Sequence, residues 1–109
     1  MSSTNREKIG FKMHLNAGQA AEYKRRHDEI PVALTELLKN AGISDYSIFL
    51  DEETNILFGV LRRSRDHSMD ELPDTELMKK WWKHMADIMH TGVGNVPVST
   101  DLQLVFHMD

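Results

Sequence analysis

The sequence YSIFLDEETNILFGVL, residues 46–61, predicts the central part of the fold of this chain. Tyr46, Ile48 and Leu50 stand at alternate positions, so they share one face of a short strand. The polar run 51–55 predicts a hairpin-type connection, and the apolar run 56–61 predicts the strand that returns. The middle of the chain is therefore predicted to be a β-hairpin, and the rest of the fold can be worked out from it in both directions.

A helix is predicted on either side of this hairpin. The helix before it ends at the stop signal 40–42, and its stripe at helical spacing consists of Tyr23, His27, Ile30, Leu34, Leu37, Leu38 and Ala41. After the hairpin, the charged residues 62–72 predict an irregular segment, and Pro73 and Asp74 then open a second helix. Its apolar stripe consists of Leu77, Met78, Trp81, Trp82, Met85 and Met89.

A strand is predicted near each end of the chain, from residues that alternate between apolar and polar. The first contains Ile9, Phe11, Met13 and Leu15, and the last contains Leu102, Leu104, Phe106 and Met108. The order β-α-β-β-α-β, with right-handed crossovers, predicts an α+β, ferredoxin-like fold. Such a fold has a four-stranded antiparallel sheet with two helices on one face, and we expect residues 1–109 to form a single domain.

The other face of this sheet would be open to water. We expect it to carry Phe49, Leu57, Leu61 and Val105 among polar residues. A face this apolar favours a partner. We therefore predict a homodimer, in the manner of a dimeric α+β barrel.

Composition narrows the possible functions. The chain has no cysteine, which excludes disulfides and thiol nucleophiles and fits a cytoplasmic location. Its first residues lack the apolar core of a signal peptide, and no apolar run is long enough to cross a membrane. The net charge is −4 and the basic residues are dispersed, so neither nucleic acid nor an anionic membrane is expected as a partner.

The six histidines do not predict a metal site. They are His14, His27, His67, His84, His90 and His107, and no two of them have the spacing H-x-H or H-x-x-x-H. We expect His14 to lie on the open face of the sheet. Neither a serine nucleophile motif nor a glycine loop for phosphate is present.

Two pairs of rings are candidates for a binding site. Tyr23 and His27 lie one helical turn apart, as either a well-satisfied core pair or one wall of a pocket. Trp81 and Trp82 diverge by about 100° on a helix, so they are either core bulk or a platform for a sugar. Pro31 has no N–H, so we expect it to break the helix and to leave the carbonyl of His27 free.

Four stretches resemble the L-rhamnose mutarotase family. They are EYKRRHDEI (22–30), DYSIFLDEETNILFGVL (45–61), MKKWWKHMADIM (78–89) and PVSTDLQLVFHM (97–108). The resemblance implies a homodimeric enzyme, an isomerase that interconverts the α and β anomers of L-rhamnose without a cofactor. It also implies that His27 is the catalytic proton donor and that Tyr23, Tyr46, Trp81 and Trp82 bind the sugar.

Two segments depart from the family pattern. The family usually reads H-x-x-I-W-P-E-L where this chain reads HDEIPVAL, and N-P-D-N-S-P-V where residues 91–98 read TGVGNVPV. They leave the preferred sugar open. The same fold also serves binding modules and cofactor-free or haem-handling monooxygenases, so a small-molecule binding module or an oxygenase is the alternative.

Overall fold

A computed structural model describes residues 6–109 and contains a four-stranded sheet. The strands are β1 (Arg6–His14), β2 (Ile43–Asp51), β3 (Ile56–Ser64) and β4 (Thr100–Leu102). Their order across the sheet is β2-β3-β1-β4, and every adjacent pair is antiparallel. The predicted α+β architecture with an antiparallel sheet is therefore confirmed.

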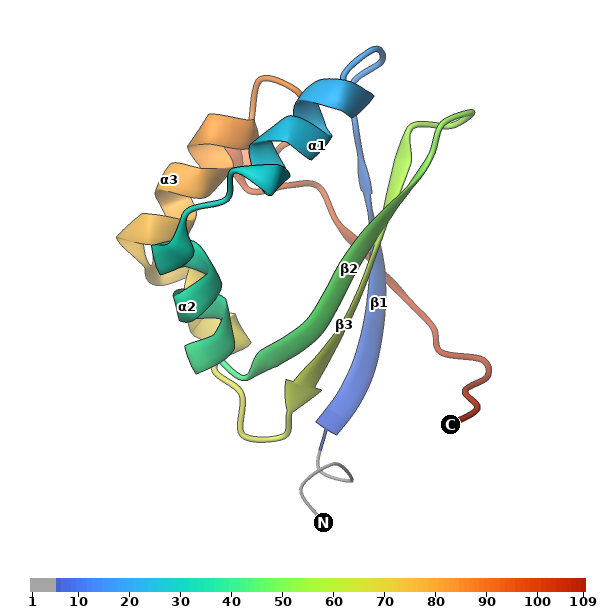
Figure 1. The fold of residues 1–109 in the computed structure, drawn as a ribbon, viewed down its shortest axis with the longest axis vertical. Coiled ribbons are helices and arrows are strands. Elements are labelled where there is room, and N and C mark those ends of the chain that lie inside the picture. The colour runs from blue at the N-terminus through green and yellow to red at the C-terminus, as the bar shows by residue number, and fades with distance from the viewer. Residues whose placement is uncertain (1–5) are drawn as a thin grey trace.

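The helices lie on one face of this sheet, as Figure 1 shows. They are α1 (Ala20–Asp28), α2 (Val32–Asn40) and α3 (Glu76–Met85), with short 3₁₀ turns at Met69–Asp74 and Val93–Asn95. The helix predicted before the hairpin is two helices, because Pro31 ends the first and caps the second. The prediction of a free His27 carbonyl is wrong, since the N–H of Ile30 donates to it at 3.2 Å.

Helix α3 begins later and ends earlier than the sequence predicts. Pro73 and Asp74 belong to the 3₁₀ turn that precedes it, and Thr75 is the N-cap, whose side chain accepts a hydrogen bond from the N–H of Met78. The helix ends at Met85, and Met89 lies beyond it in an isolated β-bridge with Leu15. Strand β3 also extends to Ser64, so residues 62–64 are not irregular.

The hairpin turn follows from local side-chain chemistry. The carboxylate of Asp51 accepts hydrogen bonds from the N–H of Glu53 and the hydroxyl of Thr54, at 3.1 and 2.9 Å. Asn55 then adopts a left-handed conformation with φ of 60°, which asparagine tolerates better than most residues. The predicted connection between β2 and β3 is confirmed.

The core between sheet and helices consists of two clusters of buried residues. The first contains Met13, Leu15, Tyr23, Leu57, Met85, Ile88 and Met89. The second contains Leu34, Ala41, Ile43, Leu61, Leu72 and Met78. Phe11 and Trp81 pack against both clusters and so join them. The prediction that Leu57 and Leu61 lie on the open face is wrong, because their partners in β1, Met13 and Ile9, face the helices.

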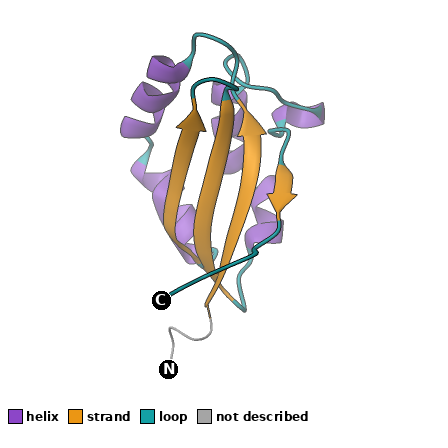
Figure 2. Cartoon of the chain, turned by 90° about the vertical axis from the view of Figure 1, so that its right-hand side faces the viewer, coloured by secondary structure: helices purple, strands orange, loops and turns teal. Residues whose placement is uncertain are grey.

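The open face of the sheet carries other apolar residues. Phe49 is 64% exposed and pairs with Phe58 across β2 and β3. Figure 2 shows this face toward the viewer, with the helices behind the sheet. His14 alternates with the helix-facing residues of β1, so it belongs to this side as predicted.

The final strand is much shorter than predicted. Only residues 100–102 pair with β1, and residues 103–109 have no regular structure. Figure 2 shows this segment leaving the sheet edge and crossing the open side. Its apolar side chains are exposed: Leu104, Val105, Phe106 and Met108. Within residues 6–109, no helix combines the length and the apolarity needed to cross a bilayer.

Candidate functional site

Helix α1 presents Tyr23 and His27 as a stacked pair. Their ring centroids are 4.3 Å apart and the ring planes differ by 28°. Tyr23 is buried and His27 is half-buried. The Nδ1 atom of His27 lies 3.0 Å from the carbonyl oxygen of Tyr23, one turn earlier in the helix. A carbonyl can only accept, so Nδ1 carries the proton in this contact, and Nε2 is left to exchange a proton with a ligand.

Helix α3 adds the third ring of this group. The Trp81 ring meets His27 edge-on, with centroids 5.2 Å apart and planes at 89°. Trp82 packs against the second core cluster, as Trp81 also does, but it is Trp81 that also packs against the first cluster, which contains Tyr23. The structure therefore brings Tyr23, His27 and Trp81 together and does not place Trp82 against His27.

Strand β2 brings Tyr46 to the same side of the sheet. One extra residue between Ser44 and Ser47 forms a β-bulge, with Asp45 at φ of 49°. Ile48 packs against the first core cluster, and so does Phe11, whose ring is next to that of Tyr46, so the predicted common face of Tyr46 and Ile48 is confirmed. The ring of Tyr46 lies 6.2 Å from that of Phe11.

Burial shifts the acid–base properties of these groups. It lowers the pKa of His27 below the ordinary 6.5, although the hydrogen bond to Tyr23 and the charge of Asp28 oppose this. Burial also raises the pKa of the Tyr23 hydroxyl, with a smaller contribution from Tyr46. Tyr46 remains 39% exposed, yet burial raises its pKa to about 12. At neutral pH the site thus holds a neutral imidazole and two neutral phenols.

Two neighbours of the site were missed in the sequence. Phe11 could have been found because it alternates with residues that face the helices. His84 follows Trp81 by three positions on α3, and the two rings are 5.7 Å apart. Its helical spacing was a usable signal. In the described part of the chain, residues 6–109, no group of three metal-ligating side chains comes together.

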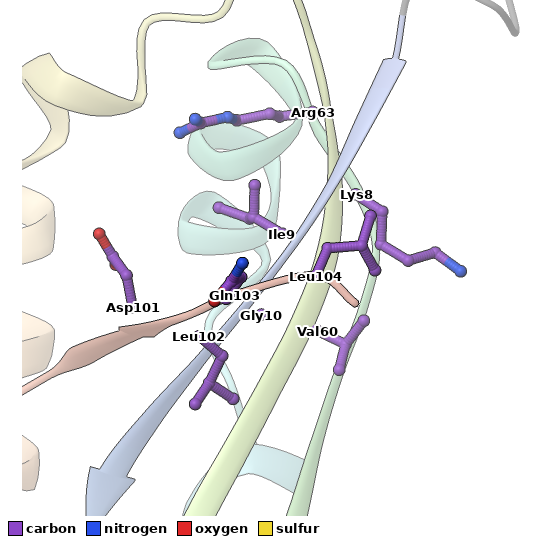
Figure 3. A pocket seen from close by; sticks show the side chains of 9 residues that line it. All are labelled: Lys8, Ile9, Gly10, Val60, Arg63, Asp101, Leu102, Gln103 and Leu104. Atoms are coloured by element: carbon purple, nitrogen blue, oxygen red, sulfur yellow. The ribbon is translucent and has the colours of Figure 1, made fainter. Parts of the chain in front are cut away.

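A cavity of about 480 Å³ lies away from this site. It is lined by residues of β1, β3 and β4 and by the segment that follows β4 (Figure 3), including Lys8, Val60, Arg63, Leu102 and Leu104. None of the predicted site residues borders it.

Comparisons with known proteins agree on one family. Residues 8–108 match the family model described as L-rhamnose mutarotase. The chain belongs to the L-rhamnose mutarotase family. It is 60% identical to an L-rhamnose mutarotase of Brucella anthropi over 94% of this chain and 96% of that protein. It is also 61% identical to one from Rhizobium leguminosarum bv. trifolii, over 94% and 96% of the two chains.

A solved structure of the same family supports the assignment. The crystal structure of L-rhamnose mutarotase from Formosa agariphila is 50% identical, with a TM-score of 0.87 over 94% of this chain and 99% of the other. A conserved protein from Methanosarcina mazei Go1, 14% identical with a TM-score of 0.61 over 94% and 95% of the two chains, shares the fold. Family membership makes the chain a carbohydrate isomerase, and the alternatives of a binding module and an oxygenase receive no support.

Proposed function

We propose that this chain interconverts the α and β anomers of L-rhamnose, with His27 as the acid–base group and without a cofactor. The observation that carries this proposal is the contact between His27 Nδ1 and the carbonyl of Tyr23. It fixes the proton on Nδ1 and leaves Nε2 as a base at neutral pH, since burial keeps the imidazole neutral.

Anomer exchange needs only proton transfers around one bond. In ring opening, Nε2 of His27 takes the proton of the anomeric hydroxyl while the bond from C1 to the ring oxygen breaks. The electron pair of that bond goes to the ring oxygen, which takes a proton from water or a second acid, and C1 becomes an aldehyde. After rotation about the C1–C2 bond, the ring oxygen attacks the other face of the aldehyde and returns its proton to the water or second acid, and the imidazolium returns its proton to O1.

The neighbouring rings would hold the sugar. The position of Trp81 beside His27 supports a role in packing against an apolar C–H face or the C6 methyl group. The hydroxyls of Tyr23 and Tyr46, neutral at working pH, can donate hydrogen bonds to sugar hydroxyls. Trp82 follows Trp81 on α3 and is also half-buried, and we propose that it contributes to sugar binding less than Trp81 does.

Replacing His27 by Asn tests the catalytic proposal. Asn keeps polarity and approximate size but cannot titrate, so the rate of anomer exchange should fall by roughly 10²–10⁴-fold. Saturation-transfer NMR on equilibrated L-rhamnose measures this rate, with L-fucose and D-glucose as comparison sugars. A well-folded His27→Asn protein with the wild-type rate would end the proposal. Wild-type protein that binds the sugar without accelerating exchange would instead indicate a binding module.

We also propose that the chain acts as a ferredoxin-like homodimer. The strand order β2-β3-β1-β4 supports the fold, and two apolar surfaces support the dimer. These are the open sheet face with Phe49 and the exposed segment 103–109, which a second copy would cover. Sedimentation should give about twice the chain mass of 12.6 kDa, and a monomer at micromolar concentration would contradict this. That residues 1–109 form a single domain and that the protein is located in the cytoplasm both stay predictions.

A further inference from the structure

Helix α1 has little apolar anchorage of its own. It is nine residues long, and Tyr23 is its buried residue. Helices this short are marginally stable in water without tertiary contacts. Yet α1 carries both Tyr23 and His27, and the 5.2 Å contact of His27 with Trp81 requires a fixed position against α3. Some other group must therefore hold α1 in place.

Arg26, the neighbour of His27, reaches across to the end of α3. Its side chain is 11% exposed. One guanidinium nitrogen, Nη1, donates to the carbonyl oxygen of His84 at 2.6 Å and to Oδ1 of Asp87 at 2.7 Å. Nη2 donates to the other carboxylate oxygen of Asp87 at 3.2 Å, and Nε donates to Glu22 at 2.7 Å. Every nitrogen of the guanidinium has a partner.

The end of α3 is a favourable place for this cation. The last carbonyls of a helix carry partial negative charge, and His84 lies in the last turn. Arg26 lowers the pKa of Asp87 through its hydrogen bond, so that carboxylate stays ionised. The segment after α3, which contains Asp87 and Ile88, is also tied to the turn after β1, because the N–H of Asn16 donates to the carbonyl of Ile88 at 2.9 Å. The receiving end of the contact is therefore well fixed.

We infer that Arg26 is a positioning residue for the reaction: through Asp87 and the His84 carbonyl it sets the distance between His27 on α1 and Trp81 on α3. This inference rests on the proposed function of His27. Three elements support it: the contact joins the two helices that carry the site, it lies beside His27 in sequence, and its forked geometry fixes orientation as well as distance.

Arg25 provides a matched control for this inference. It is the adjacent arginine on the same helix. It forms ion pairs with Glu22 of α1 and with Glu29, the residue that directly follows α1. It is 53% exposed and makes none of the contacts to α3. Arg25→Gln removes the same charge from the same helix and leaves the joint between α1 and α3 intact.

The test compares Arg26→Gln, Arg26→Lys and Arg25→Gln. We expect Arg26→Gln to lower kcat/KM for L-rhamnose by roughly 10–100-fold, since a small displacement of a catalytic group has effects of this size. Lys can reach one acceptor but cannot form the fork, so Arg26→Lys should restore part of the loss. Arg25→Gln should stay within about twofold of wild type. Asp87→Asn added to Arg26→Gln should bring little further loss, because both changes break one contact.

A readout independent of activity separates this inference from the proposed function. Nuclear Overhauser effects between ring protons of His27 and Trp81 should be strong in wild type and Arg25→Gln and weak in Arg26→Gln. All variants are measured below their melting temperatures. Unchanged Overhauser effects and unchanged kcat/KM in Arg26→Gln would overturn the inference, as would an equal loss in Arg25→Gln. If wild type itself shows no mutarotation, the proposed function fails while the Overhauser effects still decide the role of Arg26.

Discussion

Gly59 lies opposite Phe11 where β1 and β3 pair, and replacing it by alanine is a sharp test of the packing at the base of the site. A Cβ at position 59 would lie under 3.0 Å from three atoms of the Phe11 ring, namely Cζ, Cε1 and Cε2. The backbone of Gly59 is not among those with positive φ, so alanine meets no conformational barrier there. The collision with the ring is the whole of the expected cost.

The size of the effect follows from two opposing contributions. Forcing an extra methyl group into a packed core costs about 1–3 kcal/mol. Replacing glycine by alanine at a compatible backbone conformation stabilises by about 0.4–1 kcal/mol through the unfolded state. Gly59→Ala should therefore lower the free energy of unfolding by about 1–2 kcal/mol, which corresponds to a fall in Tm of roughly 5–10 °C.

The sign of the effect should reverse when the ring is removed. The leucine side chain has no atoms beyond Cδ, so Phe11→Leu removes the Cε1, Cε2 and Cζ atoms that would collide with the new methyl group. In a Phe11→Leu background, Gly59→Ala should be neutral or stabilising by up to about 1 kcal/mol. Urea unfolding of the four proteins measures this cycle. Equal destabilisation by Gly59→Ala in both backgrounds would show that the Phe11 ring is not the source of the cost.

Four further results are expected. Wild-type kcat/KM should rise with pH and level off, with a midpoint below pH 6.5, and His27→Asn should abolish this pH dependence. The free energy of unfolding should also fall as pH drops through this range, because unfolded His27 binds a proton more readily than folded His27. Trp81→Ala should weaken sugar binding more than Trp82→Ala, by fluorescence or NMR titration, and the reverse order would contradict the site geometry. Activity should survive dialysis against EDTA, and restoration by added Zn²⁺ after a loss would refute the metal-free mechanism. Thr75→Ala should cost about 1 kcal/mol in urea unfolding through loss of the α3 cap, and an unchanged midpoint would count against that cap.

Much of the fold could be predicted because its signals are local. The polar run 51–55 defines the hairpin, and Pro31 breaks a helix by covalent geometry alone. The face of β3 could not be predicted in this way. Residues 56–61 are apolar on both sides of the strand, so a period of two does not say which side is buried. Pairing with β1 decides it, and that is a long-range fact.

The candidate site was predictable to a different extent. The stack of Tyr23 on His27 follows from a spacing of four on a helix. The positions of Trp81 and Trp82 do not, because consecutive residues of a helix diverge and only the packing shows which of them meets His27. The end of β4 was mispredicted since alternation in residues 102–108 indicates a strand but not what it pairs with.

The central place of β1 in the sheet has a consequence for synthesis on the ribosome. Strand β1 is synthesised before the other strands, yet residues 10–12 on one of its edges find their partners only when residues 100–102 have been made. Until then the backbone N–H and C=O groups on that edge stay unpaired, and such an edge is a template for pairing with other nascent chains. At equal total yield, a messenger RNA loaded with closely spaced ribosomes should therefore give more aggregated protein than one on which initiation is slow and the ribosomes are far apart.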